Sequence, residues 1–193
     1  MKKTNNINQK ILIKNKIYLG NNKIKTNRNL EEFLFCETNN KHILNINYTQ
    51  QQLKKVLHLI QKIIIKNQKI LFIGKKEYTK IIIKKTAQLC EQLYINNKWT
   101  GGFLTNWNNI NGHTFDKKPQ VIILLDNTDN QMIINEAKQL NIPIIAIIDN
   151  TNTQINNIDY PIIGNTNSIK ALCFYCLLII KTITKNAQFK KIN

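Results

Sequence analysis

Four uninterrupted apolar runs constrain the fold of this chain more than any other feature. They lie at residues 70–73, 121–125, 143–148 and 161–163, and each is followed by one of the turn residues Gly74, Asp126, Asp149 and Gly164. A strand that is covered on both faces shows consecutive apolar residues, whereas a half-exposed strand alternates apolar with polar ones. The runs therefore predict buried strands of a parallel sheet. One further short strand is predicted at residues 42–46.

Helical patterns separate these runs. Apolar residues recur three and four positions apart from Leu53 to Ile64, and Thr49 with Gln52 resembles a capping box at the start of that helix. Further helices are predicted at residues 77–93, at 129–140 with Thr128 or Asp129 as cap, and from a cap at Asn167 onward. In the helix at 77–93, the residues expected to face inward are Tyr78, Ile82, Leu89 and Leu93. In the last helix they are Ile169, Leu172, Cys173, Cys176, Leu177, Ile180 and Ile183. Alternating strands and helices predict a doubly wound, flavodoxin-like α/β fold, with a parallel sheet covered by helices on both faces.

The positive charge of the chain is large and unevenly distributed. The 193 residues include 28 basic and 11 acidic ones, and residues 1–100 supply +15 of the formal net charge of +17. Such an excess indicates a polyanionic partner. Isoleucine, asparagine and lysine, whose codons are A/T-rich, make up about half of the chain, so we expect an A+T-rich genome such as that of a mitochondrion or plastid.

Charge and apolar pattern together divide the chain into three parts. Residues 1–28 contain seven lysines and Arg28 without any acidic residue, so we expect a basic extension that becomes ordered against a partner. Residues 29–185 are expected to form the α/β domain, and residues 186–193 a basic C-terminal tail.

The cysteines and the length of the apolar runs exclude other classes of protein. Four cysteines in a chain of this length do not form a disulfide framework, and we expect buried core thiols at Cys36, Cys90, Cys173 and Cys176. No metal-ligand spacing accompanies them. The longest uncharged apolar run, residues 171–180, is half of the ~20 residues that span a bilayer, so no membrane partner is predicted.

Asp126 and Asp149 support an alternative hypothesis, because ligands of doubly wound folds bind beyond the carboxyl ends of the strands. A flavodoxin-like enzyme or nucleotide-binding protein would use these two carboxylates. However, neither glycine-rich phosphate motif occurs in the chain, and aspartate is also a common cap or turn residue after a strand. We therefore predict no catalytic residue, no cofactor, no metal and no small-molecule substrate.

The segment from Lys98 to Trp107 differs from the rest of the chain. It holds both tryptophans and an adjacent glycine pair, Gly101 and Gly102. Glycine permits positive φ angles or close approach of the backbone, and tryptophan offers either core volume or a face for stacking on RNA bases. A packed loop and an RNA contact remain compatible interpretations.

The same segment carries a resemblance to a known family. Its sequence, K-W-T-G-G-F-L-T-N-W, is similar to the R-W-x-G-G-x-L-T-N-W signature of the bacterial-type ribosomal protein S2 family. Further resemblances follow the order of the chain. Residues 70–76 resemble the family's strand and turn after its first helix, and residues 141–152 and 159–165 resemble its N-I-P-x-x-A-I-x-D-T-N and D-Y-x-I-P-G-N segments. The resemblance extends from about residue 17 to 184.

This chain also departs from the family pattern. Lys98 replaces the arginine of the signature and lacks its planar, bidentate donor. Tyr18 stands where the family has the histidine of an H-x-G motif. Only residues 108–118 occupy the place of the long helical hairpin of bacterial members, so we expect that hairpin to be missing.

The resemblance implies a non-enzymatic, structural constituent of the small ribosomal subunit, which binds its rRNA and neighbouring ribosomal proteins. We expect RNA contacts in the basic N-terminal segment, in the turn after the first buried strand and in the tryptophan loop. The candidate residues are Lys14, Lys16, Lys23, Lys25, Arg28, Lys75, Lys76, Lys98, Trp99, Thr100, Gly101, Gly102 and Asn106. A shortened, lysine-rich copy indicates a mitochondrial ribosome, with a plastid ribosome as the alternative.

Overall fold

A five-stranded parallel sheet forms the centre of the computed structural model, which describes residues 7–22, 26–107, 117–126 and 130–192. Its strand order is β5-β4-β6-β7-β8, and all neighbouring pairs are parallel. The strands are β4 (Lys69–Ile73), β5 (Leu93–Ile95), β6 (Pro119–Leu124), β7 (Ile144–Ile148) and β8 (Tyr160–Ile163). The order reverses between β4 and β6, which is the switch point of a flavodoxin-like sheet. The predicted fold class is therefore confirmed.

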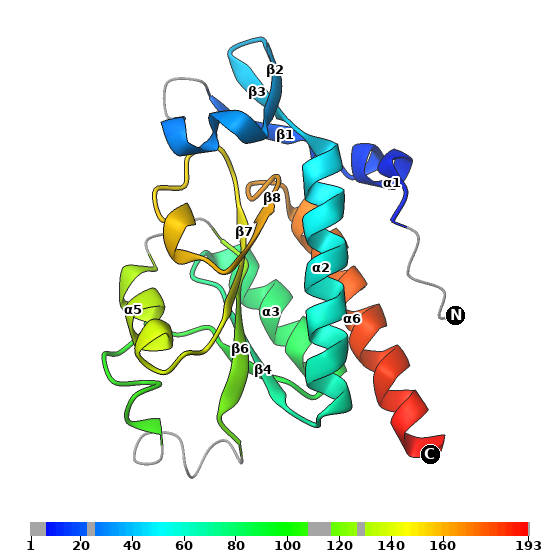
Figure 1. Ribbon diagram of the computed structural model, residues 1–193, viewed down its shortest axis with the longest axis vertical. Coiled ribbons are helices and arrows are strands. Elements are labelled where there is room, and N and C mark those ends of the chain that lie inside the picture. The colour runs from blue at the N-terminus through cyan, green and yellow to red at the C-terminus, as the bar shows by residue number, and fades with distance from the viewer. Residues whose placement is uncertain (1–6, 23–25, 108–116, 127–129, 193) are drawn as a thin grey trace.

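Helices cover both faces of this sheet (Figure 1). One face carries α2 (Ile46–Ile65), α3 (Glu77–Cys90) and α6 (Ile169–Ile192), and the other carries α5 (Gln131–Gln139) together with residues 98–107. Successive side chains of a strand point to opposite faces, so Ile70 and Phe72 pack under the three helices while Leu71 and Ile73 pack on the α5 side. Two buried clusters result, one on each side of the sheet.

A small antiparallel sheet lies over the carboxyl edge of the large one. Its strands, in the order β1-β3-β2, are β1 (Leu19–Asn22), β2 (Leu34–Thr38) and β3 (Lys41–Leu44), and the 3-10 helix η2 (Arg28–Phe33) precedes β2. The sequence predicted only the strand at 42–46. Four of the five β2 residues are exposed and Leu34 is half-buried, so no alternating pattern reveals this strand.

The N-terminal segment, which we expected to be a basic extension, contributes side chains to the core. A short helix, α1 (Gln9–Lys14), contacts α2, and Ile7, Leu12 and Ile17 are buried. β1 then pairs with β3. The three isoleucine and leucine side chains are spaced among lysines, and only their burial against α2 and its neighbours distinguishes them from a solvated tail.

Two helix boundaries differ from the prediction. Helix α2 begins one turn before Thr49, because the Asn45 side chain accepts from the Asn47 N–H at 3.0 Å and acts as its cap. Thr49 is buried within the helix, where its hydroxyl donates to the carbonyl of Ile163 at 2.6 Å.

Helix α3 ends at Cys90 because Glu91 adopts a left-handed conformation with φ of 54°, and Leu93 lies in strand β5. Leu89, predicted to face inward, is 66% exposed.

The last helix also presents a different face to the core. It begins after Ser168, whose hydroxyl accepts from the Ala171 N–H at 3.4 Å, and it continues through the expected C-terminal tail to Ile192. Ile169 and Leu177 are exposed, whereas Tyr175 is completely buried.

Helix α5 has Asn130 at its cap position, and the predicted caps Thr128 and Asp129 lie outside the described residues. A 3-10 helix, η3 (Ile155–Asn157), links β7 to β8.

None of the helices in the described ranges has the length and apolarity that a membrane-spanning helix needs.

Candidate nucleic-acid interface

An open groove of about 560 Å³ lies at the carboxyl edge of the parallel sheet, where β1 and the start of α6 meet. Its lining is rich in amides and hydroxyls and contains one ammonium group: Leu19, Gly20, Asn21, Asn22, Lys41, Thr151, Asn165, Asn167 and Ser168. Amides and hydroxyls both donate and accept hydrogen bonds. Such a lining suits the phosphates, sugars and base edges of a polynucleotide.

Asparagine side chains build one wall of this groove. The Asn165 carboxamide oxygen accepts from the N–H groups of Asn167 (3.0 Å) and Ser168 (3.1 Å), which shapes the turn before α6. Its amide nitrogen donates to the carbonyl of Lys16 at 3.1 Å. The Lys76 ammonium donates to the Asn167 side chain at 3.2 Å. This turn therefore brings together Lys16 and Lys76, two predicted RNA contacts that are 60 positions apart in the sequence.

Asp149 connects the groove to the end of β7. Its carboxylate accepts from the side chains of Asn21 (2.7 Å) and Thr166 (2.5 Å) and from both the N–H and the hydroxyl of Thr151 (2.9 and 2.6 Å). Asn150 adds a bond from the Asn21 N–H at 2.6 Å. Asp149 as a residue is only 2% exposed. Its carboxylate therefore holds β1 and the turn before α6 in place rather than facing solvent.

Asp126 occupies the switch point between β4 and β6. One of its carboxylate oxygens accepts from the backbone N–H groups of Lys75 (2.6 Å) and Lys76 (3.0 Å) and from the Thr79 hydroxyl (2.8 Å). These donors form the N-terminus of α3, which is the position where such folds hold a phosphate. The chain's own carboxylate fills that position, and its donors come from another segment of the chain rather than from the turn after β6.

Residues 98–107 form a packed loop on the α5 face. Trp99 and Trp107 are 7% and 6% exposed, and the Phe103 ring lies between them at centroid distances of 4.9 and 5.9 Å. The indole of Trp99 is therefore part of the core, in agreement with the packed-loop interpretation, and an RNA contact of this residue stays a prediction. The volume and hydrophobicity of the two indoles provide the physical reason, because burying them removes large apolar areas from water.

A single buried carboxylate holds this loop. Glu136 of α5 accepts from the Trp99 indole N–H (3.0 Å) and from the backbone N–H groups of Gly102 (3.0 Å) and Leu104 (2.9 Å). Gly102 has a φ of 84°, whereas Gly101 is exposed and, within the described part of the chain, has only the Met132 side chain near a possible Cβ position. Sequence reasoning missed Glu136, because nothing in its local context distinguishes it from a surface glutamate.

The remaining predicted contacts lie in several places. Lys14, Lys16 and Arg28 are exposed in the N-terminal segment, and Lys75 and Lys76 are half-buried at the carboxyl edge. Lys98, Thr100 and Asn106 are exposed on the tryptophan loop, while Lys23 and Lys25 lie outside the described residues. Lys41 was missed, since only the hairpin of β2 and β3 places it in the groove.

The cysteines do not form one class. Burial raises the pKa of the Cys90 thiol to about 11 and that of Cys176 to about 12. Cys173 is half-buried, and Cys36 is exposed on β2, which corrects the expectation of four buried thiols. Among the described residues, no group of three or more histidine, cysteine, aspartate or glutamate side chains has the geometry to hold a metal ion.

Comparison with known proteins now gives this geometry a context. The chain matches the family described as ribosomal protein S2 over residues 12–115 and 111–186, and the two matches meet in the connection where the sequence predicts the hairpin to be missing. Residues 108–116 of that connection lie outside the described residues.

Individual proteins of this family are also similar to the chain. The small ribosomal subunit protein uS2 of Ehrlichia ruminantium (strain Gardel) is 32% identical over 208 residues, which cover 86% of this chain and 72% of the relative. The uS2 protein of Rickettsia conorii is 28% identical over 221 residues, with 92% and 75% covered. Fold, ordered motifs and both comparisons lead to one conclusion: the chain belongs to the ribosomal protein S2 family.

Proposed function

We propose that this chain is a structural constituent of the small ribosomal subunit, where it binds small-subunit rRNA and neighbouring ribosomal proteins. Membership in the ribosomal protein S2 family over residues 12–186 is the observation that carries this proposal. The ribosome is that of a mitochondrion; the abundance of residues with A/T-rich codons and the relatives in Ehrlichia and Rickettsia support this location.

Electrostatics supports binding to RNA. A net charge of +17 attracts a polyanion at long range, and lysine contacts to phosphates release condensed counterions. The groove at the carboxyl edge adds neutral donors and acceptors next to Lys16, Lys41 and Lys76. On the tryptophan loop, the exposed Lys98, Thr100 and Asn106 offer further polar contacts, with Gly101 and Gly102 shaping the backbone between them.

The protein has a non-enzymatic role. Asp126 and Asp149, the residues of the enzyme alternative, both accept several hydrogen bonds from their own chain. Neither residue is among those that line the groove. Their role in this proposal is to position the turns after β4 and β7.

A sedimentation profile of a native extract tests the assignment. We expect the protein to migrate with small ribosomal subunits at low salt; protein that stays at the top of the gradient under conditions that keep the subunit intact would contradict it. Binding of the isolated protein to small-subunit rRNA should weaken by roughly 10³–10⁵ between 50 and 200 mM salt if 6–10 phosphates are contacted.

Two substitutions separate this role from the enzyme alternative. Asp126→Asn and Asp149→Asn should each cost about 1–3 kcal/mol of stability, because each buried carboxylate accepts several hydrogen bonds, and the folded variants should still enter the subunit. Stoichiometric, saturable binding of ATP, flavin or Mg²⁺ that these substitutions abolish would instead favour an enzyme.

A further inference from the structure

The three helices on one face of the sheet are almost free of acidic residues. Helices α2, α3 and α6 together contain eleven lysines and one acidic residue, Glu77, whereas the rest of the chain contains 17 basic and ten acidic residues. Because these helices cover the same face, the imbalance becomes a property of one surface (Figure 1). None of the RNA contacts predicted from the sequence lies on these helices.

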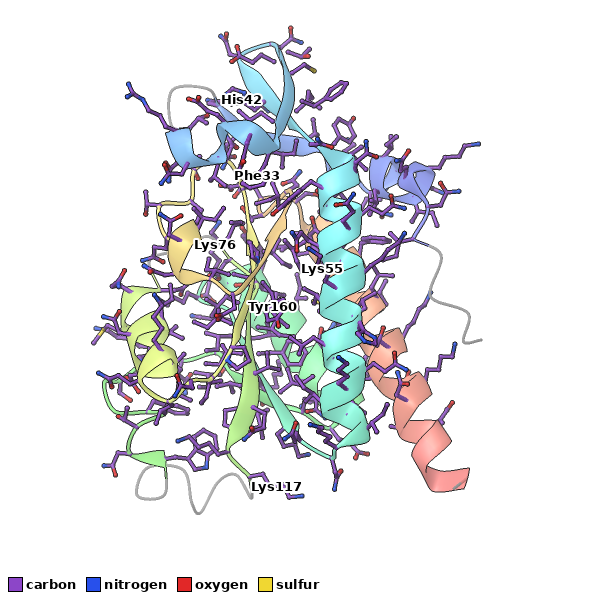
Figure 2. All side chains as sticks on the ribbon, viewed as in Figure 1. Phe33, His42, Lys55, Lys76, Lys117 and Tyr160 are labelled. Carbon is purple, nitrogen blue, oxygen red and sulfur yellow. The ribbon has the colours of Figure 1, made fainter. Side chains whose placement is uncertain are left out.

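Beyond the first turn of each helix, eight lysines of this layer with described side chains are both exposed and unpaired. Four belong to α2 and the residue after it, two to α3 and two to α6: Lys54, Lys55, Lys62, Lys66, Lys84, Lys85, Lys181 and Lys185. We call this set the lysine face; Lys55 is labelled on α2 in Figure 2. Within the described ranges, none of the eight ammonium groups forms a hydrogen bond or ion pair. By contrast, Lys80 pairs with Glu77 at 2.6 Å and Lys69 donates to the Glu91 carbonyl at 2.7 Å.

The arrangement of the helices joins these lysines into one surface. Helix α6 packs against both α2 and α3, so the lysines of α6 lie between those of its neighbours. Lys55, Lys62 and Lys66 fall on one stripe of α2, since steps of seven and four residues return to the same side of a helix. This stripe is ~17 Å long at 1.5 Å per residue.

Neither composition nor helix propensity accounts for the imbalance. An A/T-rich codon bias adds asparagine as readily as lysine, yet the three helices contain two of the 31 asparagines. Helix propensity disfavours asparagine, but it favours glutamate about as much as lysine, and only one glutamate is present. Intramolecular stability does not explain it either, because like charges on neighbouring helical positions repel and no acidic partner offsets them.

We propose that the lysine face contacts the sugar-phosphate backbone of small-subunit rRNA, as a second RNA surface apart from the groove and the tryptophan loop. This inference rests on the proposed function, which supplies the polyanion. Lysine is a compact point charge without a bidentate fork, so the surface neutralises phosphates and fixes orientation without reading bases. The unpaired charges find their partners only in the assembled subunit.

Two triple variants with the same change in net charge test the proposal. One, Lys55→Gln with Lys62→Gln and Lys66→Gln, removes the α2 stripe. The control, Lys117→Gln with Lys118→Gln and Lys138→Gln, removes three lysines from outside the helical layer. Figure 2 places Lys117 at the end of the molecule opposite to His42. Thermal melts should agree within about 0.5 kcal/mol for all forms, because surface substitutions of this kind have little effect on stability.

The readout is the slope of log K against log salt for a transcript of the cognate small-subunit rRNA. We expect the α2 variant to lose about 2–3 from the slope, and affinity on the order of 10²-fold at 0.1 M salt, while the control keeps the wild-type slope. If both variants behave alike, the lysine face is not an RNA surface. If the wild-type protein itself neither binds the transcript nor sediments with subunits, the proposed function fails instead.

Two further measurements cover the remaining outcomes. If the α2 variant folds poorly, chemical acetylation of the lysines of wild-type protein replaces it as the test. The residues expected to be protected in the assembled subunit, relative to free protein, are Lys55, Lys62, Lys84 and Lys181. Equal reactivity in the two states overturns the proposal.

Exposed aliphatic residues such as Ile65 and Leu177 also lie on this layer, a combination that membrane-surface helices show. Pelleting with anionic vesicles that the α2 variant abolishes, with an unchanged rRNA slope, would assign the face to a membrane and overturn the RNA contact.

Discussion

The indole N–H of Trp99 donates to Oε1 of Glu136 at 3.0 Å, and this bond links the most distinctive sequence segment to a residue 37 positions away. The same carboxylate accepts two backbone N–H groups of the loop. A glycine-rich turn thus acquires a fixed shape from one buried acid on α5.

Glu136→Gln should destabilise the protein by about 1–3 kcal/mol, because a carboxamide offers one acceptor oxygen where two oxygens now accept three donors. Urea unfolding measures the loss, and tryptophan fluorescence reports the loop. Glu32→Gln, at an exposed position, is the control and should change stability by less than about 0.5 kcal/mol. Equal effects of the two substitutions would show that the carboxylate does not hold the loop.

The two adjacent glycines should respond differently to substitution. Gly102→Ala places a Cβ on a residue with φ of 84° and should cost about 1–2 kcal/mol. Gly101→Ala should be close to neutral, because the nearest atom to its new Cβ is the Met132 methyl at 3.9 Å. The sequence indicated positive φ or close backbone approach for this pair without distinguishing the two positions. Paired thermal melts test the difference, and a Gly101 variant as damaged as the Gly102 variant would contradict the structure.

Gly164→Ala should be rescued by Tyr175→Phe. A Cβ at residue 164 would lie 1.9 Å from the Tyr175 hydroxyl oxygen, an overlap that should cost about 1–3 kcal/mol or more. Among the described residues this buried hydroxyl has no hydrogen-bond partner, so Tyr175→Phe alone should be neutral or stabilising. A double-mutant cycle by denaturant unfolding measures the coupling. Strictly additive effects would refute the close approach.

Alkaline pH should destabilise the fold through its buried thiols. Burial raises the pKa of Cys90 to about 11 and of Cys176 to about 12, from an ordinary value of 9.0. Below pH 9 both folded and unfolded chains keep these protons. As pH rises above 9, the unfolded chain binds fewer protons than the folded one, so stability falls until the folded pKa is passed. Unfolding at pH 8 and pH 10 should show a smaller decrease in Cys176→Ala than in Cys36→Ala, which alters an exposed thiol.

Two substitutions in α1 separate packing from charge in the N-terminal segment. Leu12→Ala should cost about 2–5 kcal/mol, because Leu12 is fully buried. Lys14→Gln should leave the unfolding midpoint unchanged and reduce the salt slope of rRNA binding by about 1. If Leu12→Ala has no effect on unfolding, the segment is the separate extension that its charge indicated.

Local pattern was enough for the architecture. The runs ending before Gly74, Asp126, Asp149 and Gly164 became β4, β6, β7 and β8, since consecutive apolar residues are stable only in strands covered on both faces. Short or exposed strands were missed for the same reason. The three residues of β5 continue a helical pattern, and β2 has no buried side from which a period could be read.

The sequence by itself determined the fold class, the family resemblance and the excess of positive charge, because strand periodicity, ordered motifs and residue counts are local or additive. Tertiary structure decided which residues are buried and which partners the polar ones bind. Trp99 lies in the core, and so does Leu12 from within a basic segment. Thr49, expected at a helix cap, donates from a buried position to the carbonyl of Ile163. Tertiary structure also placed Lys41 in a groove and gathered the lysines of three separate helices onto one face. The physical reason is that burial and hydrogen-bond partners come from segments distant in the chain, and only packing determines which segments meet.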